Sequence, residues 1–137
     1  MSLAFDNLTN EDIWVAYMFL SQDVCRGEGH DWQAIGWFHL PGVQAHEVPH
    51  HAKGPSAVGS NTRTVYANDL RNVNNRYWYY YAQNASGSVV WAGPVSVHVS
   101  NQAFNHCIGE GRTDWWIAGF RRLDLGSANN AVIYLTA

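Results

Sequence analysis

Residues 76–83 read RYWYYYAQ, with five aromatic side chains in a row followed by a small residue and an amide. Aromatic residues fit the pleated surface of a sheet, so this stretch favours a strand. The alternation of a strand would place Tyr77, Tyr79 and Tyr81 on one face and the two aromatic residues between them on the other. A core needs aromatic residues on only one face, so the question is what the second face contacts.

Short aromatic and β-branched runs, separated by turn residues, continue along the chain on both sides of this stretch. The turn pair Pro41-Gly42 ends one run, and the turn NASG (84–87) joins two others as a hairpin. About eight strands at regular spacing predict an all-β fold, either an antiparallel β-sandwich or a small barrel, and we expect the sandwich. The predicted strands are residues 12–20, 32–40, 62–67, 76–83, 88–93, 94–100, 115–125 and 130–136.

One short helix is expected near residues 101–108. Phe104 and Ile108 are four positions apart, as on one face of a helix, and Gly109 or Gly111 would end it. Cys107 lies in this segment and Cys25 lies far from it in the sequence. The two cysteines could form one disulfide in an exported chain or remain separate thiols, and both interpretations stay open.

Length and composition predict one folded domain over residues 1–137. Hydrophobic residues make up 47% and charged residues 14%, which is typical of a folded chain. The net charge is −3 and the basic residues are scattered, so we expect no nucleic-acid partner. No apolar run approaches the ~20 residues of a membrane span, and the N-terminus lacks the basic and apolar regions of a signal peptide.

Four segments together resemble the DUF1036 family of small, mostly bacterial, often exported domains. They are GWFHLPG (36–42), TVYANDLRNVNNRYWYYYAQ (64–83), SVVWAG (88–93) and HCIGEGRTDWWIAGFRRLDLGSANNAVIYLT (106–136). The resemblance covers most of the chain and strengthens the expected architecture. It implies export but no activity, and it brings no catalytic residues.

The chain departs from the family pattern in its cysteines and in one loop. Family cysteines near the start and after the Pro-Gly turn are replaced by Phe5-Asp6 and Val43-Gln44, and only Cys107 keeps a family position. The resemblance therefore does not imply a family-type disulfide. An apparent insertion, QAHEVPHHAKGPSAVGSNTR, occupies about residues 44–63.

The insertion carries a candidate site for a divalent metal. His46, His50 and His51 place three imidazoles within six residues, and neutral imidazole is a common ligand of zinc, copper and nickel. Pro49 favours an extended loop, and no recognised zinc spacing is met. The alternative is a polar surface loop that is rich in histidine and holds no cofactor.

The sequence indicates no catalytic residues. No serine lies in a G-x-S-x-G elbow. The carboxylates Glu110, Asp114 and Asp124 are scattered, so nothing pairs them across a cleft as a glycosidase requires. A non-enzymatic protein is therefore expected.

The aromatic strand is the strongest candidate for a binding surface. Tyrosine and tryptophan give large rigid contact areas with a polar tip, which suits a carbohydrate or a protein partner. The expected ligand-binding residues are Tyr77, Tyr79, Tyr81, Trp91, Asn74 and Arg76. Three alternatives remain: the second face is merely covered by the histidine loop and the short helix, the histidines form a metal site with possible enzymatic activity, or the aromatic face joins copies of the chain as a homo-oligomeric subunit of an exported or toxin-like assembly.

Overall fold

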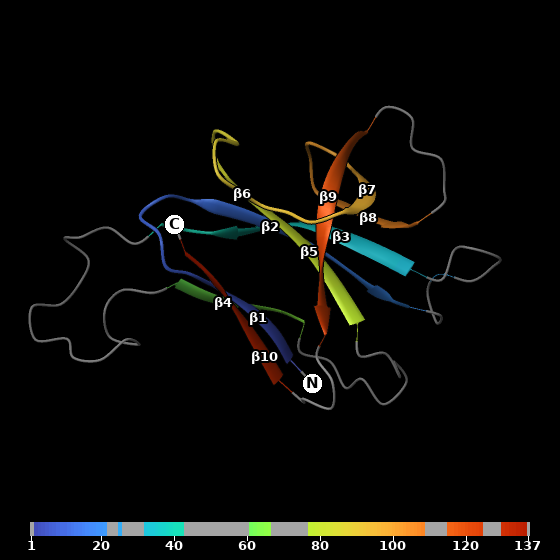
Figure 1. The fold of residues 1–137 in the computed structure, drawn as a ribbon, viewed down its shortest axis with the longest axis horizontal. Coiled ribbons are helices and arrows are strands. Elements are labelled where there is room, and N and C mark those ends of the chain that lie inside the picture. The colour runs from blue at the N-terminus through green and yellow to red at the C-terminus, as the bar shows by residue number, and fades with distance from the viewer. Residues whose placement is uncertain are drawn as a thin grey trace, which may run out of the picture.

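The computed structural model describes residues 2–21, 25, 32–42, 61–66, 77–108, 115–124 and 130–136. All regular elements in these residues are strands, so the fold is all-β, as predicted (Figure 1). The described residues contain no helix that could cross a membrane. The strands are β1 (Ser2–Asn7), β2 (Ile13–Leu20), β3 (Trp32–Leu40), β4 (Asn61–Tyr66), β5 (Tyr77–Asn84), β6 (Val90–Trp91), β7 (Val95–Val99), β8 (Phe104–Cys107), β9 (Trp116–Asp124) and β10 (Asn130–Leu135).

The strands form a small and a large sheet. The small sheet has the order β10-β1-β4, in which β1 pairs with β10 in parallel and with β4 antiparallel. The large sheet has the order β7-β9-β5-β2-β3-β8, and β6 also pairs with β5. Its pairings are antiparallel, with β5 and β2 at its centre. The aromatic strand β5 therefore has neighbours on both edges.

The predicted helix near residues 101–108 is wrong. Residues 101 and 102 form a bend, and β8 follows, paired with β3. Phe104 and His106 are buried while Asn105 between them is exposed, which is the two-residue period of a strand. The four-residue spacing of Phe104 and Ile108 is equally compatible with a strand, because four is a multiple of two.

One further strand differs from the expectations. Strand β1 was not predicted, and it pairs with β10 from the opposite end of the chain, which no local pattern reveals. Residues 61–63 of the apparent insertion belong to β4. The rest of the insertion lies outside the described residues.

One face of β5 packs against the small sheet. Trp78 is fully buried there, and its ring stacks on Phe19 of β2 with centroids 4.9 Å apart. Tyr80 contacts Phe5 of β1 at 5.3 Å. We call this set the closed cluster; its buried members are Leu3, Phe5, Ile13, Val15, Tyr17, Phe19, Leu40, Trp78, Tyr80, Ala82 and Leu135.

The other face of β5 packs against strands of its own sheet, which curls over it. Tyr81 shares a cluster with residues of β7 and β9 and with Phe104 of β8, although β7 and β8 are at opposite ends of the sheet order. We call this set the curled cluster; its buried members are Ala16, Met18, Ala34, Tyr81, Val97, Val99, Phe104, Ala118 and Phe120. Both faces of β5 are thus covered by protein.

A disulfide between Cys25 and Cys107 decides between the two open interpretations of the cysteines. It joins the segment after β2 to the end of β8, with Cα atoms 5.5 Å apart and a sequence separation of 82. Closing a loop of this length stabilises the fold by about 4.5 kcal/mol in the chain-entropy account. The bridge therefore helps to hold the outer strand β8 in place.

A buried asparagine joins the β1–β2 turn to the end of β3. The side chain of Asn7 is fully buried, and its Nδ2 donates to the carbonyl oxygens of Glu11, Leu40 and Pro41 at 2.8, 3.0 and 3.1 Å. Its Oδ1 accepts from the backbone N–H and the hydroxyl of Thr9 at 2.9 and 2.7 Å. Buried polar groups need such partners, so Asn7 holds the end of β3 against the β1–β2 turn.

Candidate functional site

The predicted tyrosine face does not form an open surface. Tyr81 is only 7% exposed, and its ring meets the edges of Trp37 and Trp116 at centroid distances of 5.9 and 5.8 Å. Burial raises the pKa of the Tyr81 hydroxyl, so this group remains a neutral hydrogen-bond donor at ordinary pH. Tyr81 is part of the curled cluster and supports whatever lies above it.

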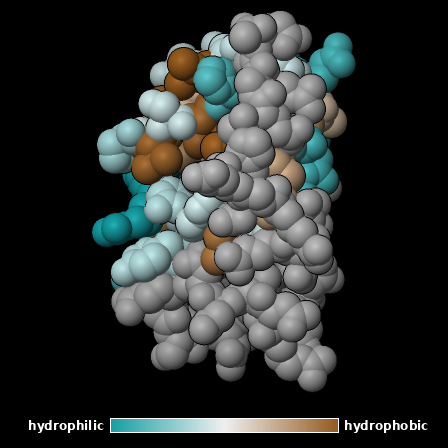
Figure 2. All heavy atoms as spheres, turned by 90° about the vertical axis from the view of Figure 1, so that its right-hand side faces the viewer, coloured by the Kyte–Doolittle hydropathy of each residue, from teal (hydrophilic) through white to brown (hydrophobic). Residues whose placement is uncertain are grey.

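Tyr77 and Tyr79 lie on the same face as Tyr81 and are half-buried. The guanidinium of Arg122 lies 5.1 Å from the centre of the Tyr77 ring. Tyr79 packs edge-on against Trp32 at 5.5 Å and lines an apolar groove of about 250 Å³. On the side of the molecule in Figure 2, apolar side chains of the described residues gather in its upper half, in small patches between polar ones.

The grouping of Trp91 with these tyrosines is wrong. Trp91 is paired with Ala82, and directly paired residues share a face, so it packs on the closed cluster. Asn74, Arg76 and the candidate metal ligands His46, His50 and His51 lie outside the described residues. Within the described part of the chain, no group of three or more His, Cys, Asp or Glu residues is arranged to hold a metal ion.

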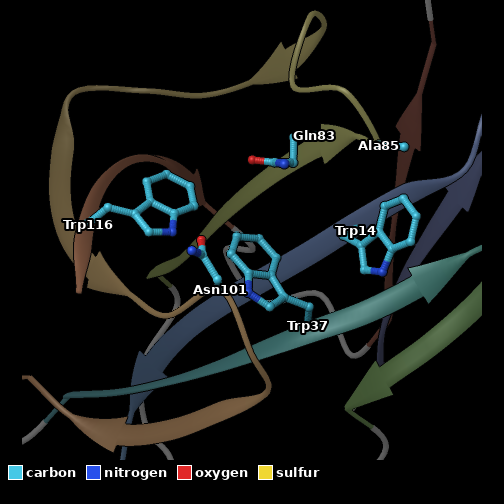
Figure 3. Close-up of a pocket in the computed structure, with 6 residues that line it drawn as sticks. All are labelled: Trp14, Trp37, Gln83, Ala85, Asn101 and Trp116. Atoms are coloured by element: carbon cyan, nitrogen blue, oxygen red, sulfur yellow. The ribbon is translucent and has the colours of Figure 1, made fainter. Parts of the chain in front are cut away.

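A pocket of about 210 Å³ opens at the end of the tyrosine face of β5 (Figure 3). Gln83 follows Tyr81 on the same face, and the strand register places Trp14 of β2 directly opposite it. Figure 3 shows Trp37 and Trp116 on either side of the Asn101 side chain. We call this site the tryptophan pocket; its lining residues are Trp14, Trp37, Gln83, Ala85, Asn101 and Trp116.

A β-bulge directs Trp37 into the pocket. The register between β2 and β3 shifts between Val15 and Tyr17, where Val15 pairs with Phe38 and Tyr17 with Ile35. Two residues of β3, Gly36 and Trp37, therefore lie opposite one residue of β2. Trp37 packs with the curled cluster while its neighbour Phe38 packs with the closed cluster. Bulges commonly redirect a side chain in this way beside functional sites.

The Trp37 ring is held on several sides. Its indole N–H donates to the carbonyl oxygen of Ser100 at 2.7 Å. The ring stacks on Trp116 with centroids 6.1 Å apart and planes at 10°, and it meets Phe104 edge-on at 5.7 Å. The indole nitrogen of Trp116 is buried without a hydrogen-bond partner among the described residues. The two rings thus form a preorganised aromatic wall.

Trp14 connects the pocket to a contact between His39 and Asp12 behind it. Its ring stacks on His39 with centroids 4.8 Å apart and planes at 23°. Nε2 of His39 lies 3.1 Å from Oδ2 of Asp12, and Oδ1 of Asp12 accepts the backbone N–H of Gly42 at 2.8 Å. The Gly42 N–H, followed by His39, lowers the pKa of Asp12 below its ordinary value of 3.8. This arrangement supports the outer face of Trp14.

The chemistry of the pocket suits binding. Among the described residues, its lining carries three indole rings, two carboxamides and one methyl group, with no charged side chain. Stacking and hydrogen bonding are available, and these six lining residues include no nucleophile, acid or base. No family model matches the chain, and no curated protein or solved structure is significantly similar to it.

Sequence reasoning found the strand that leads to this pocket but missed the pocket. The alternation that groups Tyr77, Tyr79 and Tyr81 reaches Gln83 after one further step, and this signal could have extended the predicted site. The adjacent pair Trp37-Phe38 also indicates that its two rings face apart, as they do, whereas Trp115 and Trp116 both pack on the curled cluster. Nothing local indicates that Trp14, Trp37 and Trp116 meet.

Proposed function

We propose that the protein is a non-enzymatic binding module whose tryptophan pocket holds an uncharged carbohydrate ring. The observation that carries this proposal is the described lining, which has three indole rings and two carboxamides and no charged side chain. A sugar ring has an apolar C–H face, which stacks on an aromatic ring, and a rim of hydroxyl groups, which exchange hydrogen bonds with amides.

The size of the pocket favours one ring over an extended chain. Its 210 Å³ is below the typical range of drug-sized sites and corresponds to about seven water molecules. Trp37 is already fixed by Ser100 and Trp116, so little side-chain freedom would be lost when a ligand binds. This preorganisation supports a specific site of modest affinity.

We add three proposals about the chain: its sheet arrangement, its family and its cellular compartment. We propose that the two sheets form the β-sandwich expected from the strand spacing, with β1 and β10 as a parallel pair, because these two strands share the closed cluster with β2 and β5. Kinship with the DUF1036 domains rests on the sequence motifs. The disulfide supports an oxidising compartment and thus an exported chain.

A glycan array with matched variants tests the proposed function. The purified protein should bind a set of glycans, and Trp14→Ala should remove these signals while Trp91→Ala retains them. Trp91 is the control because it is half-buried on the opposite face of β5. A blank array, or an equal loss of signal in both variants, would overturn the carbohydrate assignment.

Self-association is a second candidate function, supported by exposed residues of β10. This strand is at the end of the small sheet, and Val132 and Tyr134 are 42% and 61% exposed. Exposed apolar side chains on an outer strand favour edge-to-edge pairing between copies. Light scattering at high concentration should report an oligomer that Tyr134→Lys dissociates, whereas a monomer at all concentrations would rule this function out.

A further inference from the structure

The hydroxyl group of Tyr81 sets the orientation of the Gln83 side-chain amide, which lines the tryptophan pocket. The Tyr81 hydroxyl donates to Oε1 of Gln83 at 2.9 Å. Because Tyr81 is held among the rings of the curled cluster, this bond also fixes the plane of the Gln83 amide. The Nε2 amino group of Gln83 is then the end left for a ligand, and it has no acceptor among the described residues. It can only donate.

The other polar groups of the pocket leave Gln83 as its fixed donor. The indole N–H of Trp116 is buried, so it does not face a ligand in the pocket. The indole N–H of Trp37 is already used by Ser100. Asn101 supplies one further amide, exposed at the rim. The oriented Nε2 group of Gln83 therefore favours a ligand that brings an acceptor oxygen.

The acceptor oxygen that fits this pocket is neutral. A carboxylate or sulfate would lose its hydration against the described lining residues, which include no lysine or arginine, and this is unfavourable unless a cation compensates. A carbonyl oxygen accepts the same hydrogen bonds without a full charge. The aromatic walls and the methyl group of Ala85 would in turn cover a small apolar group beside that carbonyl.

We propose that the tryptophan pocket selects a 2-acetamido sugar, whose carbonyl accepts from Nε2 of Gln83 and whose methyl group packs on the indole rings. This inference rests on the proposed carbohydrate function and names its ligand class. In it, Gln83 touches the ligand, and Tyr81 is a positioning residue that acts through Gln83. A sugar with only hydroxyl groups lacks both the carbonyl and the methyl contact.

Titration followed by intrinsic tryptophan fluorescence tests the inference with defined probes. The probes are N-acetylglucosamine, glucose and glucuronic acid. The wild-type protein should bind N-acetylglucosamine about tenfold more tightly than glucose, from one hydrogen bond and one buried methyl group, and glucuronic acid no more tightly than glucose. Equal affinities, or a preference for glucuronic acid, would overturn the selectivity and leave the carbohydrate pocket standing. Absence of binding by all three probes and by a glycan array would overturn both proposals.

Two variants with matched controls identify the residues responsible. Gln83→Glu replaces the donating amino group by an oxygen and should abolish the preference for N-acetylglucosamine over glucose. The control Gln102→Glu adds the same charge beside the pocket residue Asn101 and should keep this preference.

Tyr81→Phe should lower the ratio of the affinity for N-acetylglucosamine to the affinity for glucose, because it frees the Gln83 amide to rotate. The affinity for glucose itself should change little. Tyr134→Phe is its control on the exposed strand β10. An unchanged ratio in folded Gln83→Glu and Tyr81→Phe would contradict the assignment. If these variants do not fold, the wild-type ratio alone decides.

Discussion

The two faces of β5 carry similar aromatic residues but end in different surroundings. On one face, Trp78 and Tyr80 are sealed by a separate sheet, and the rings of Trp78 and Phe19 stack with planes at 11°. On the other face, Tyr81 is covered by the curl of its own sheet, which leaves the tryptophan pocket open beside Gln83. A separate layer can close over a face completely, whereas a sheet that bends back on itself leaves openings between its strands and turns.

The largest loss of stability should come from a cavity in the closed cluster, on the Trp78 face of β5. Trp78→Ala removes a fully buried indole from the closed cluster and should lower the free energy of unfolding by about 3–5 kcal/mol. Urea denaturation followed by circular dichroism measures this loss. A decrease below about 1 kcal/mol would show that the small sheet does not seal this face as tightly as its burial indicates.

The contact between the β1–β2 turn and the end of β3 should be the next most sensitive point. Asn7→Asp removes the Nδ2 group that donates to three carbonyl oxygens and places an acceptor against them. We expect a loss of about 2–3 kcal/mol in unfolding free energy. The matched change Gln102→Glu, at an exposed position, should cost almost nothing. Equal effects of the two changes in the same urea titration would contradict the role given to Asn7.

The pocket side should respond in affinity rather than in stability. Trp14→Ala removes one half-buried wall of the tryptophan pocket, so we expect about a tenfold weaker affinity for N-acetylglucosamine. The unfolding free energy should fall by no more than about 1.5 kcal/mol, less than half the loss expected for Trp78→Ala. Calorimetric titration and urea denaturation measure the two quantities. A large loss of unfolding free energy with an unchanged affinity would show that Trp14 belongs to a closed core and does not line a ligand site.

The smallest effect concerns the contact between His39 and Asp12 behind Trp14. The pKa of Asp12 is lowered from 3.8 in the folded protein, so its contribution to stability is fully present above pH 3.8 and is lost as the pH falls through the folded value. Asp12→Asn should therefore destabilise the protein at pH 7 by less than about 1 kcal/mol, since the pair is about half exposed. Thermal unfolding at pH 7 and pH 2.5 should show this difference shrinking in acid. A difference that grows in acid would contradict the assignment.

The alternation of side chains within each strand was predictable from the sequence, but the segments that cover each face of β5 were not. The period of two correctly separates Tyr77, Tyr79 and Tyr81 from Trp78 and Tyr80, because it depends only on local geometry. Which face seals depends on contacts between distant segments, such as the parallel pairing of β1 with β10. The bulge at Gly36-Trp37 and the disulfide between Cys25 and Cys107 likewise arise from tertiary structure. The pocket depends on all of these, so the sequence could indicate its strand but not its walls.

Indole N–H resonances test the central claim most directly, since each tryptophan contributes one signal in a ¹⁵N–¹H correlation spectrum. During titration with N-acetylglucosamine, the signals of Trp14, Trp37 and Trp116 should shift together along one saturating curve. The signals of Trp78 and Trp91, which belong to the opposite face of β5, should stay in place. Shifts confined to Trp78 and Trp91, or no shift of any indole signal at saturating sugar, would contradict the account.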